Sequence, residues 1–203
     1  MKKRLLALFL TLGLVCTVLT ACGDGSKDQG GQGNNGGEAV SGGEITVGIA
    51  KDLDDSLDPH RMVTAGTREV LFNLFEGLVK PNSKGELIPA VAEKYTTSAD
   101  GLTYTFTLRD GVRFHNGNAV TAEDVIYSIK RCADNEGSAI DSSLVSAFSV
   151  ISDVQATDDK TVVLTLKQPD LELLNFLTAA IVPANYDKLD TEPCGTGPFK
   201  FSS

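Results

Sequence analysis

The chain has 203 residues and a formal net charge of −9 at pH 7, with 18 basic and 27 acidic residues. The negative charge argues against nucleic-acid binding, because proteins that bind phosphate backbones present clustered basic residues. The two histidines, His60 and His115, lie in separate segments that match no zinc-binding spacing, so the sequence predicts neither a metal site nor a cofactor.

The first 22 residues have the pattern of an export signal. Three basic residues at positions 2–4 precede an apolar run over positions 5–19, which is shorter than the roughly 20 residues that a membrane-spanning helix needs. The run ends in LTAC, which resembles a bacterial lipobox, so Cys22 is the expected lipidation site. The alternatives are a plain secretory signal or an uncleaved anchor with an incidental cysteine.

Residues 23–43 read GDGSKDQGGQGNNGGEAVSGG and contain almost no apolar side chain. Such a segment cannot bury enough apolar surface to fold, so we expect a disordered tether. The remaining residues, 44–203, are numerous enough to form a domain with a hydrophobic core.

The first elements of this domain are predicted from apolar periodicity. Alternating apolar residues over 45–49 predict an opening strand, and apolar side chains at helical spacing over 70–78 predict a helix. The sequence PNSKG at 81–85 is typical of a turn, and residues 89–93 are expected to start a short helical turn.

The segment 85–131 contains the most informative pattern. A strand is predicted at 94–98, and LTYTFTL at 102–108 alternates apolar residues with threonines, as in a half-buried strand. Thr121 stands at an N-cap position with Asp124 three residues later, which predicts a helix from there. This order of turn, paired strands and capped helix closely resembles the signature of family 5 extracellular solute-binding proteins, the peptide, dipeptide and nickel receptors of ABC importers.

The second half of the chain continues with alternating elements. A helix is predicted at 144–148, and strands at 150–157 and 161–166 flank a tight-turn sequence, so they are expected to pair antiparallel. Residues 171–179 are expected to be helical and 181–182 extended. The predicted fold class is therefore α+β, with a mixed sheet and helices packed on it.

The family resemblance implies a more specific architecture. The chain would be the first lobe of a two-lobed periplasmic-binding-protein-like fold (type II, cluster C), with the second lobe missing, as in a truncated gene product or a fragment. Residues 44–68 and 170–203 would form one subdomain, and residues 69–169 an inserted one that carries the signature.

The signature itself is expected to be mainly structural. Packing alone explains the alternation around Tyr104 and Phe106, and Phe114 is assigned the same role. Arg109 is predicted to form a local ion pair with the adjacent Asp110 rather than to bind a ligand.

The resemblance places the ligand-facing residues after LDPH at 57–60, on the first-lobe side of the cleft. A segment with small side chains and a glycine can pair with an extended peptide as an added strand. The alternative is a helix-entry loop that uses Thr64 or Thr67 as its cap, and the two interpretations are compatible. The candidate ligand-binding residues are Met62, Val63, Thr64, Ala65 and Gly66.

The function implied by the resemblance is that of a monomeric, lipid-anchored substrate-binding protein of an ABC importer. It would capture peptides or a related small solute outside the bacterial cytoplasmic membrane, close around them by a hinge motion, and deliver them to the permease. No catalytic motif is visible, so no enzymatic activity is predicted. The alternatives are an extracytoplasmic lipoprotein hydrolase and a truncated remnant that binds nothing tightly.

Two cysteines fall in the exported domain, Cys132 and Cys194. Outside the cytoplasm they could form a disulfide, but two free thiols are the favoured alternative, since the sequence does not bring them within bonding distance.

Overall fold

The computed structural model describes residues 45–49, 56–61, 64–133 and 139–202. The predicted export signal, Cys22 and the predicted tether lie outside these residues, as do Met62 and Val63. The chain divides into two units, residues 1–46 and 47–203, and the helices and strands described below all belong to the second. Within the described part of the chain, no helix is long and apolar enough to cross a membrane.

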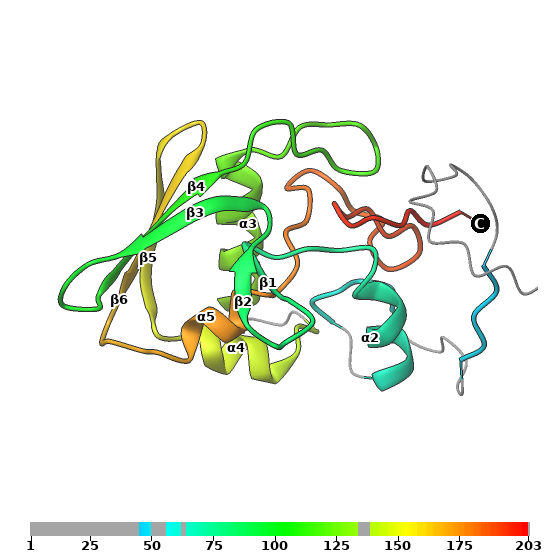
Figure 1. Ribbon diagram of the computed structural model, residues 1–203, viewed down its shortest axis with the longest axis horizontal. Coiled ribbons are helices and arrows are strands. Elements are labelled where there is room, and N and C mark those ends of the chain that lie inside the picture. Colours follow the sequence, from blue (N-terminus) through cyan, green and yellow to red (C-terminus); the bar gives the residue numbers. More distant parts are fainter. Residues whose placement is uncertain (1–44, 50–55, 62–63, 134–138, 203) are drawn as a thin grey trace, which may run out of the picture. The chain divides into compact units, whose positions relative to one another are not determined.

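The second unit contains a four-stranded antiparallel sheet, which lies on the left in Figure 1. The side chains of its two inner strands alternate between a buried and a partly exposed face, as the threonine pattern predicts. Phe106 stands opposite Tyr95 on one side and Val162 on the other. In sheet order, the strands are β3 (Ala92–Thr97), β4 (Thr103–Leu108), β6 (Thr161–Leu166) and β5 (Ile151–Asp158).

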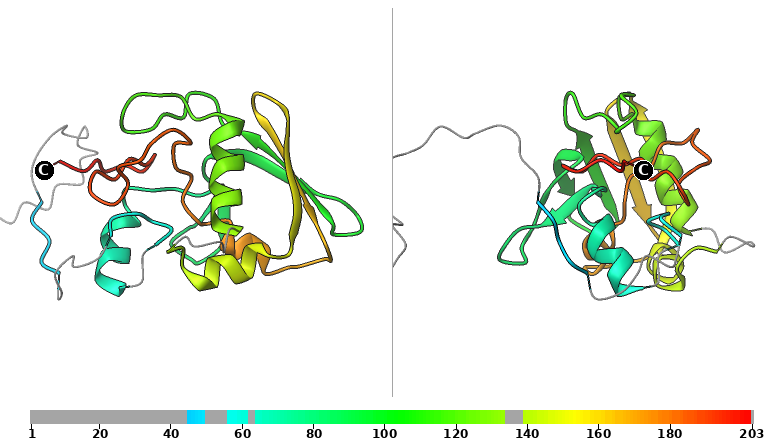
Figure 2. Two further views of the ribbon diagram at one scale, coloured as in Figure 1. Left: turned by 180° about the vertical axis from the view of Figure 1, so that it is seen from behind. Right: turned by 90° about the vertical axis from the view of Figure 1, so that its right-hand side faces the viewer.

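Helix α3 (Ala122–Ala133) lies across one face of this sheet (Figure 2). Its buried side chains include Val125 and Ile129, which join the main hydrophobic core. The predicted cap is confirmed: Asp124 accepts hydrogen bonds from the amide and the hydroxyl of Thr121, at 2.9 and 2.8 Å. The helix therefore begins where the sequence predicted.

A two-stranded hairpin, β1 (Val79–Pro81) and β2 (Leu87–Pro89), precedes the sheet. The predicted turn between them is confirmed, and Gly85 has the positive φ of +81° that favours glycine. The predicted helical turn at 89–93 is wrong. The amides of Ala90 and Ala92 donate to the carbonyl of Leu78, and these bonds hold the segment extended beside the hairpin.

Helix α2 (Ala65–Leu71) is shorter than the predicted helix over 70–78 and begins earlier. The chain turns after Leu71 because the C-terminal segment of the described chain lies against the turn. The Leu74 carbonyl accepts from the Gly197 amide at 2.9 Å, and the Asn73 carbonyl accepts from the Phe199 amide at 3.2 Å. A Cβ atom on Gly197 would lie only 2.5 Å from the Asn73 oxygen, so only glycine fits this approach.

Several other predictions differ from the structure. Residues 45–49 form no strand, and Ile45 and Val47 are exposed, because no neighbouring strand pairs with them among the described residues. Residues 181–182, which were expected to be extended, belong to no helix and no strand. The described strand pairs are all antiparallel, whereas a mixed sheet was expected. Arg109 donates to the Ala90 carbonyl at 3.1 Å instead of pairing with its neighbour in sequence.

Two short helices complete the unit. Helix α4 (Ser142–Phe148) confirms the prediction at 144–148, and α5 (Leu173–Phe176) covers only the centre of the predicted helix at 171–179. Cys132 and Cys194 are both buried and free, as favoured from the sequence. Burial raises the pKa of the Cys132 thiol to about 12, which leaves it protonated and unreactive at neutral pH.

Candidate functional site

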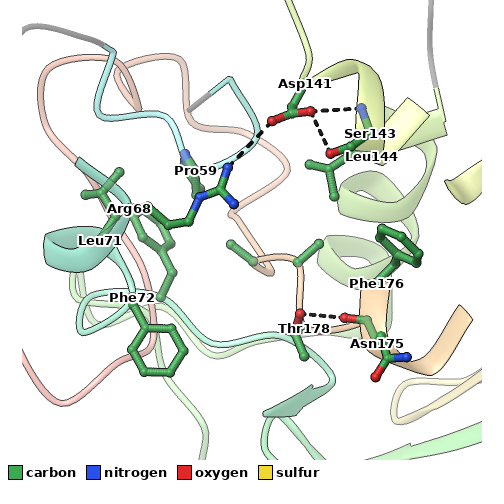
Figure 3. A pocket seen from close by; sticks show the side chains of 13 residues that line it. Pro59, Arg68, Leu71, Phe72, Asp141, Ser143, Leu144, Asn175, Phe176 and Thr178 are labelled. Atoms are coloured by element: carbon green, nitrogen blue, oxygen red, sulfur yellow. Dashed lines mark hydrogen bonds and ion pairs between the residues drawn. The ribbon is translucent and has the colours of Figure 1, made fainter. Parts of the chain in front are cut away.

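A cavity of about 350 Å³ lies between α2, α4 and α5 (Figure 3). Its volume is within the range of small-molecule sites, roughly 300 to 1,000 Å³. Most of its lining is apolar, from residues such as Leu71, Phe72, Leu144 and Phe176. Its polar lining comes from separate segments of the chain: Arg68, Asp141, Ser143, Asn175 and Thr178.

Arg68 on α2 points across the cavity toward Asp141 (Figure 3). The distance between Arg68 Nη2 and Asp141 Oδ2 is 3.9 Å, which is an ion pair but too long for a hydrogen bond. Asp141 is itself fixed as the N-cap of α4, since its Oδ1 accepts from the amide and the hydroxyl of Ser143, at 2.8 and 2.7 Å. The Ser143 hydroxyl and amide and the Arg68 charge lower the pKa of Asp141, so it is ionised at neutral pH.

Three of the predicted ligand-binding residues, Thr64, Ala65 and Gly66, lie at the start of α2. Thr64 is the N-cap, in an extended conformation, and its hydroxyl donates to the Thr67 hydroxyl at 2.9 Å rather than to the helix backbone. Ala65 and Gly66 are the first residues of the helix, so their backbone is not available as an added strand in this conformation. Ala65 lines a second cavity, which also contacts Arg68, Glu69 and Phe72.

The loop 56–61 before this segment is held by a buried charge cluster. Arg131, in the last turn of α3, pairs with both carboxylate oxygens of Asp58, and the Nη1–Oδ1 distance is 2.9 Å. Arg131 Nη1 also donates to His60 Nδ1 at 2.7 Å, while His60 Nε2 donates to the Ala180 carbonyl at 2.8 Å. These partners assign the neutral tautomer with the proton on Nε2.

The pKa values of the cluster agree with this assignment. Burial, together with the positive charge of Arg131, lowers the pKa of His60 from 6.5 to about 4. Burial alone would raise the pKa of Asp58, but the hydrogen bond and charge of Arg131 outweigh it and hold that pKa below its usual value. The cluster therefore consists of an ion pair and a neutral imidazole, and it fixes the loop immediately before position 62.

The neutral state of His60 predicts a loss of stability in mild acid. The unfolded chain binds a proton near pH 6.5 and the folded one only near pH 4, so the free energy of unfolding falls as the pH falls through this window. We expect a loss of about 2 kcal/mol from His60 between pH 7 and pH 5. Urea denaturation at the two pH values measures this loss.

The matched variant for this prediction is His60→Gln, which removes the titrating group. Its stability at pH 7 should be lower, because the hydrogen bonds of His60 are disturbed, but its decrease between pH 7 and pH 5 should be smaller by the same 2 kcal/mol or so. Equal decreases in wild type and variant would show that His60 is not buried in its neutral form.

Comparison with known proteins identifies relatives of the whole domain. Residues 86–203 match the family model described as bacterial extracellular solute-binding proteins, family 5 Middle. The chain is 29% identical over 202 residues to the glutathione-binding protein GsiB of Shigella dysenteriae serotype 1, covering 96% of this chain and 36% of that protein. It is 39% identical over 135 residues to the oligopeptide-binding protein OppA of Bacillus subtilis, covering 66% of this chain and 24% of that protein.

Solved structures give the same result. The periplasmic binding protein DppA from Helicobacter pylori, in complex with the peptide STSA, superposes with a TM-score of 0.65 at 30% identity, over 73% of this chain and 34% of that one. The chain thus spans about a third of the length of the proteins that it matches.

None of the predicted residues that the structure describes, Thr64, Ala65 and Gly66, lines the 350 Å³ cavity, and the sequence analysis did not predict this cavity. Arg68, Asp141 and Asn175 come from three segments that no local pattern connects. Arg131 was also missed as the partner of Asp58; the signal available was a basic residue in the last turn of a capped helix, which by itself points only to the helix dipole.

Proposed function

Since the chain belongs to family 5 of the bacterial extracellular solute-binding proteins, we propose that it captures a peptide or a related small solute outside the cytoplasmic membrane and delivers it to an ABC permease. The observation that carries this proposal is the family match over 86–203 in a chain whose described residues form a ligand-sized cavity. The family consists of binding proteins and is not a family of enzymes, which speaks against the hydrolase alternative.

The ligand class is proposed from the relatives and from the chemistry of the cavity. The relatives named above bind glutathione, oligopeptides and the peptide STSA. A cavity with an apolar wall, an arginine, a carboxylate and an amide can hold a small peptide through both its side chains and its charged groups. Residues 62–66 would contribute at the entry of α2, and hinge closure would bury the bound solute.

We also propose the subdomain division, 44–68 with 170–203 against the insertion 69–169, from the family resemblance, and both clusters of the hydrophobic core cross this division. The larger is built on the sheet and α3 but also contains Leu173, Leu177 and Cys194. The smaller brings Leu71 and Phe75 together with Ala180, Val182 and Leu189. The first subdomain would therefore also include the end of α2.

Binding without turnover is the direct test of the proposed function. The purified protein is titrated with glutathione and with the peptide STSA by isothermal calorimetry, and the mixtures are analysed by mass spectrometry. We expect saturable binding, a higher unfolding temperature and unchanged solutes. Glucose serves as the control solute. Hydrolysis products would support the hydrolase alternative, and the absence of any binding would support the non-binding remnant.

Membrane attachment through Cys22 is a separate part of the proposal, supported by the lipobox-like sequence at 19–22 and the glycine-rich segment after it. Bacteria that express the protein with radiolabelled palmitate should incorporate label into the wild type and none into Cys22→Ser. Cys16→Ser is the matched control and should be labelled normally. Equal labelling of wild type and Cys22→Ser would exclude Cys22 as the lipid site.

A further inference from the structure

We propose that Arg68 determines the specificity of this site by binding a carboxylate group of the solute. The inference rests on the proposed function, because it assigns a ligand chemistry to the same cavity.

Arg68 differs from the other arginines that the structure describes. Its guanidinium makes no hydrogen bond to any described residue, and its side chain is 60% exposed at the cavity. The other four described arginines are all engaged. Arg61 donates to Asp190, Arg109 to the Ala90 carbonyl, Arg113 to the Gly117 carbonyl and Arg131 to Asp58.

The geometry at Arg68 suits a carboxylate. A guanidinium presents parallel N–H groups whose spacing matches the two oxygens of a carboxylate, and such bidentate pairs are among the strong charge-assisted hydrogen bonds. Asp141 approaches to 3.9 Å and orients the arginine without taking up its donors. Because Ser143 holds Asp141 through Oδ1, this orienting charge is fixed in place.

The surroundings narrow the class of solute further. Asp141 Oδ2 lies beside Arg68, so a polyanion would be repelled, whereas a solute with both a carboxylate and an ammonium group meets both charges. Phe72, which is 62% exposed, and Leu144 line the same cavity and offer an apolar surface. A short peptide or peptide-like amino acid derivative has all three features.

The test pairs substitutions in the protein with changes in the solute. The probes are STSA and glutathione with free carboxylates, together with forms in which each carboxylate in turn is a carboxamide. Arg68→Met removes the donors, Arg68→Lys keeps the charge but loses the fork, and Arg113→Met is the matched control, since Arg113 lines none of the cavities described above. Calorimetric Kd values are compared for proteins with the same unfolding temperature.

We expect Arg68→Met to weaken binding of a free-carboxylate probe about 10- to 100-fold. Arg68→Lys should weaken it by a smaller factor, because the positive charge remains. One of the carboxamide forms should bind wild type and Arg68→Met equally weakly, which identifies the carboxylate that Arg68 binds. Arg113→Met should bind like wild type.

Two results would overturn the inference separately from the proposed function. If wild type binds the probes and Arg68→Met binds them equally well, or if Arg113→Met loses as much affinity as Arg68→Met, the solute is bound without a specific contact to Arg68. If wild type binds none of the probes, the proposed function and the inference both fail.

Discussion

Replacement of Arg131 by methionine should lower the free energy of unfolding by about 3 to 5 kcal/mol, because it leaves the carboxylate of Asp58 buried without its partner. Asp58 is 1% exposed and accepts two hydrogen bonds from Arg131. A loss of this size is a large fraction of the 5 to 15 kcal/mol that stabilises a typical domain. Urea denaturation followed by circular dichroism measures it.

Two further variants test whether this loss of stability comes from the broken ion pair or from any substitution on helix α3. Lys130→Met, at the exposed neighbouring position, should change stability by no more than about 0.5 kcal/mol. Arg131→Met combined with Asp58→Asn should be more stable than Arg131→Met alone, because the uncompensated charge is gone. A double variant less stable than the single one would contradict this explanation.

Gly195→Ala should destabilise the domain by about 3 kcal/mol, the upper range of overpacking effects. The added Cβ would overlap the carbonyl oxygen of Leu74 and lie 2.7 Å from Phe75 Cδ1. The backbone cannot move aside without breaking the hydrogen bonds that hold this segment, in which the Gly197 amide donates to the Leu74 carbonyl and the His115 amide to the Gly195 carbonyl, both at 2.9 Å. Thermal and urea unfolding of the variant check the prediction.

The control is Gly48→Ala, a glycine with no described atom within 4 Å of the added Cβ, which should leave stability nearly unchanged. If Gly195→Ala were as stable as this control, the segment around Gly195 would not lie on the turn after α2, and the observed end of that helix would need another cause.

The elements predicted correctly are those fixed by neighbours in sequence. The Thr121 cap, the turn at Gly85 and the antiparallel pair β5–β6 all depend on side chains or turns within a few residues. Their physical causes are local, so the sequence displays them directly.

The elements predicted wrongly depend on distant partners. Helix α2 is followed by a turn whose Leu74 and Asn73 carbonyls accept from the Gly197 and Phe199 amides, some 120 residues further along the chain. The strand predicted at 45–49 has the required alternation but no described strand beside it. Periodicity shows which residues are apolar, but not which segment will cover them.

In the candidate site, too, contacts between distant segments were not predicted from the sequence. The family resemblance predicted ligand-facing residues at 62–66, and none of those that the structure describes lines the 350 Å³ cavity. Arg68 was not predicted, because its ion pair with Asp141 joins two segments that are distant in sequence. Asp58 is buried with its charge neutralised by Arg131, and no pattern in the sequence connects these two residues.

The contacts of the loop 56–61 also set the order in which the molecule can form. His60 binds a carbonyl 120 residues away, and Leu57 donates to the Asp190 carbonyl at 3.1 Å. A nascent chain on the ribosome can pair β3 with β4 and close the β5–β6 hairpin soon after synthesis, but the lining of the cavity requires residues up to Ala180. Such long-range contacts form slowly. The sheet can therefore form before the cavity does.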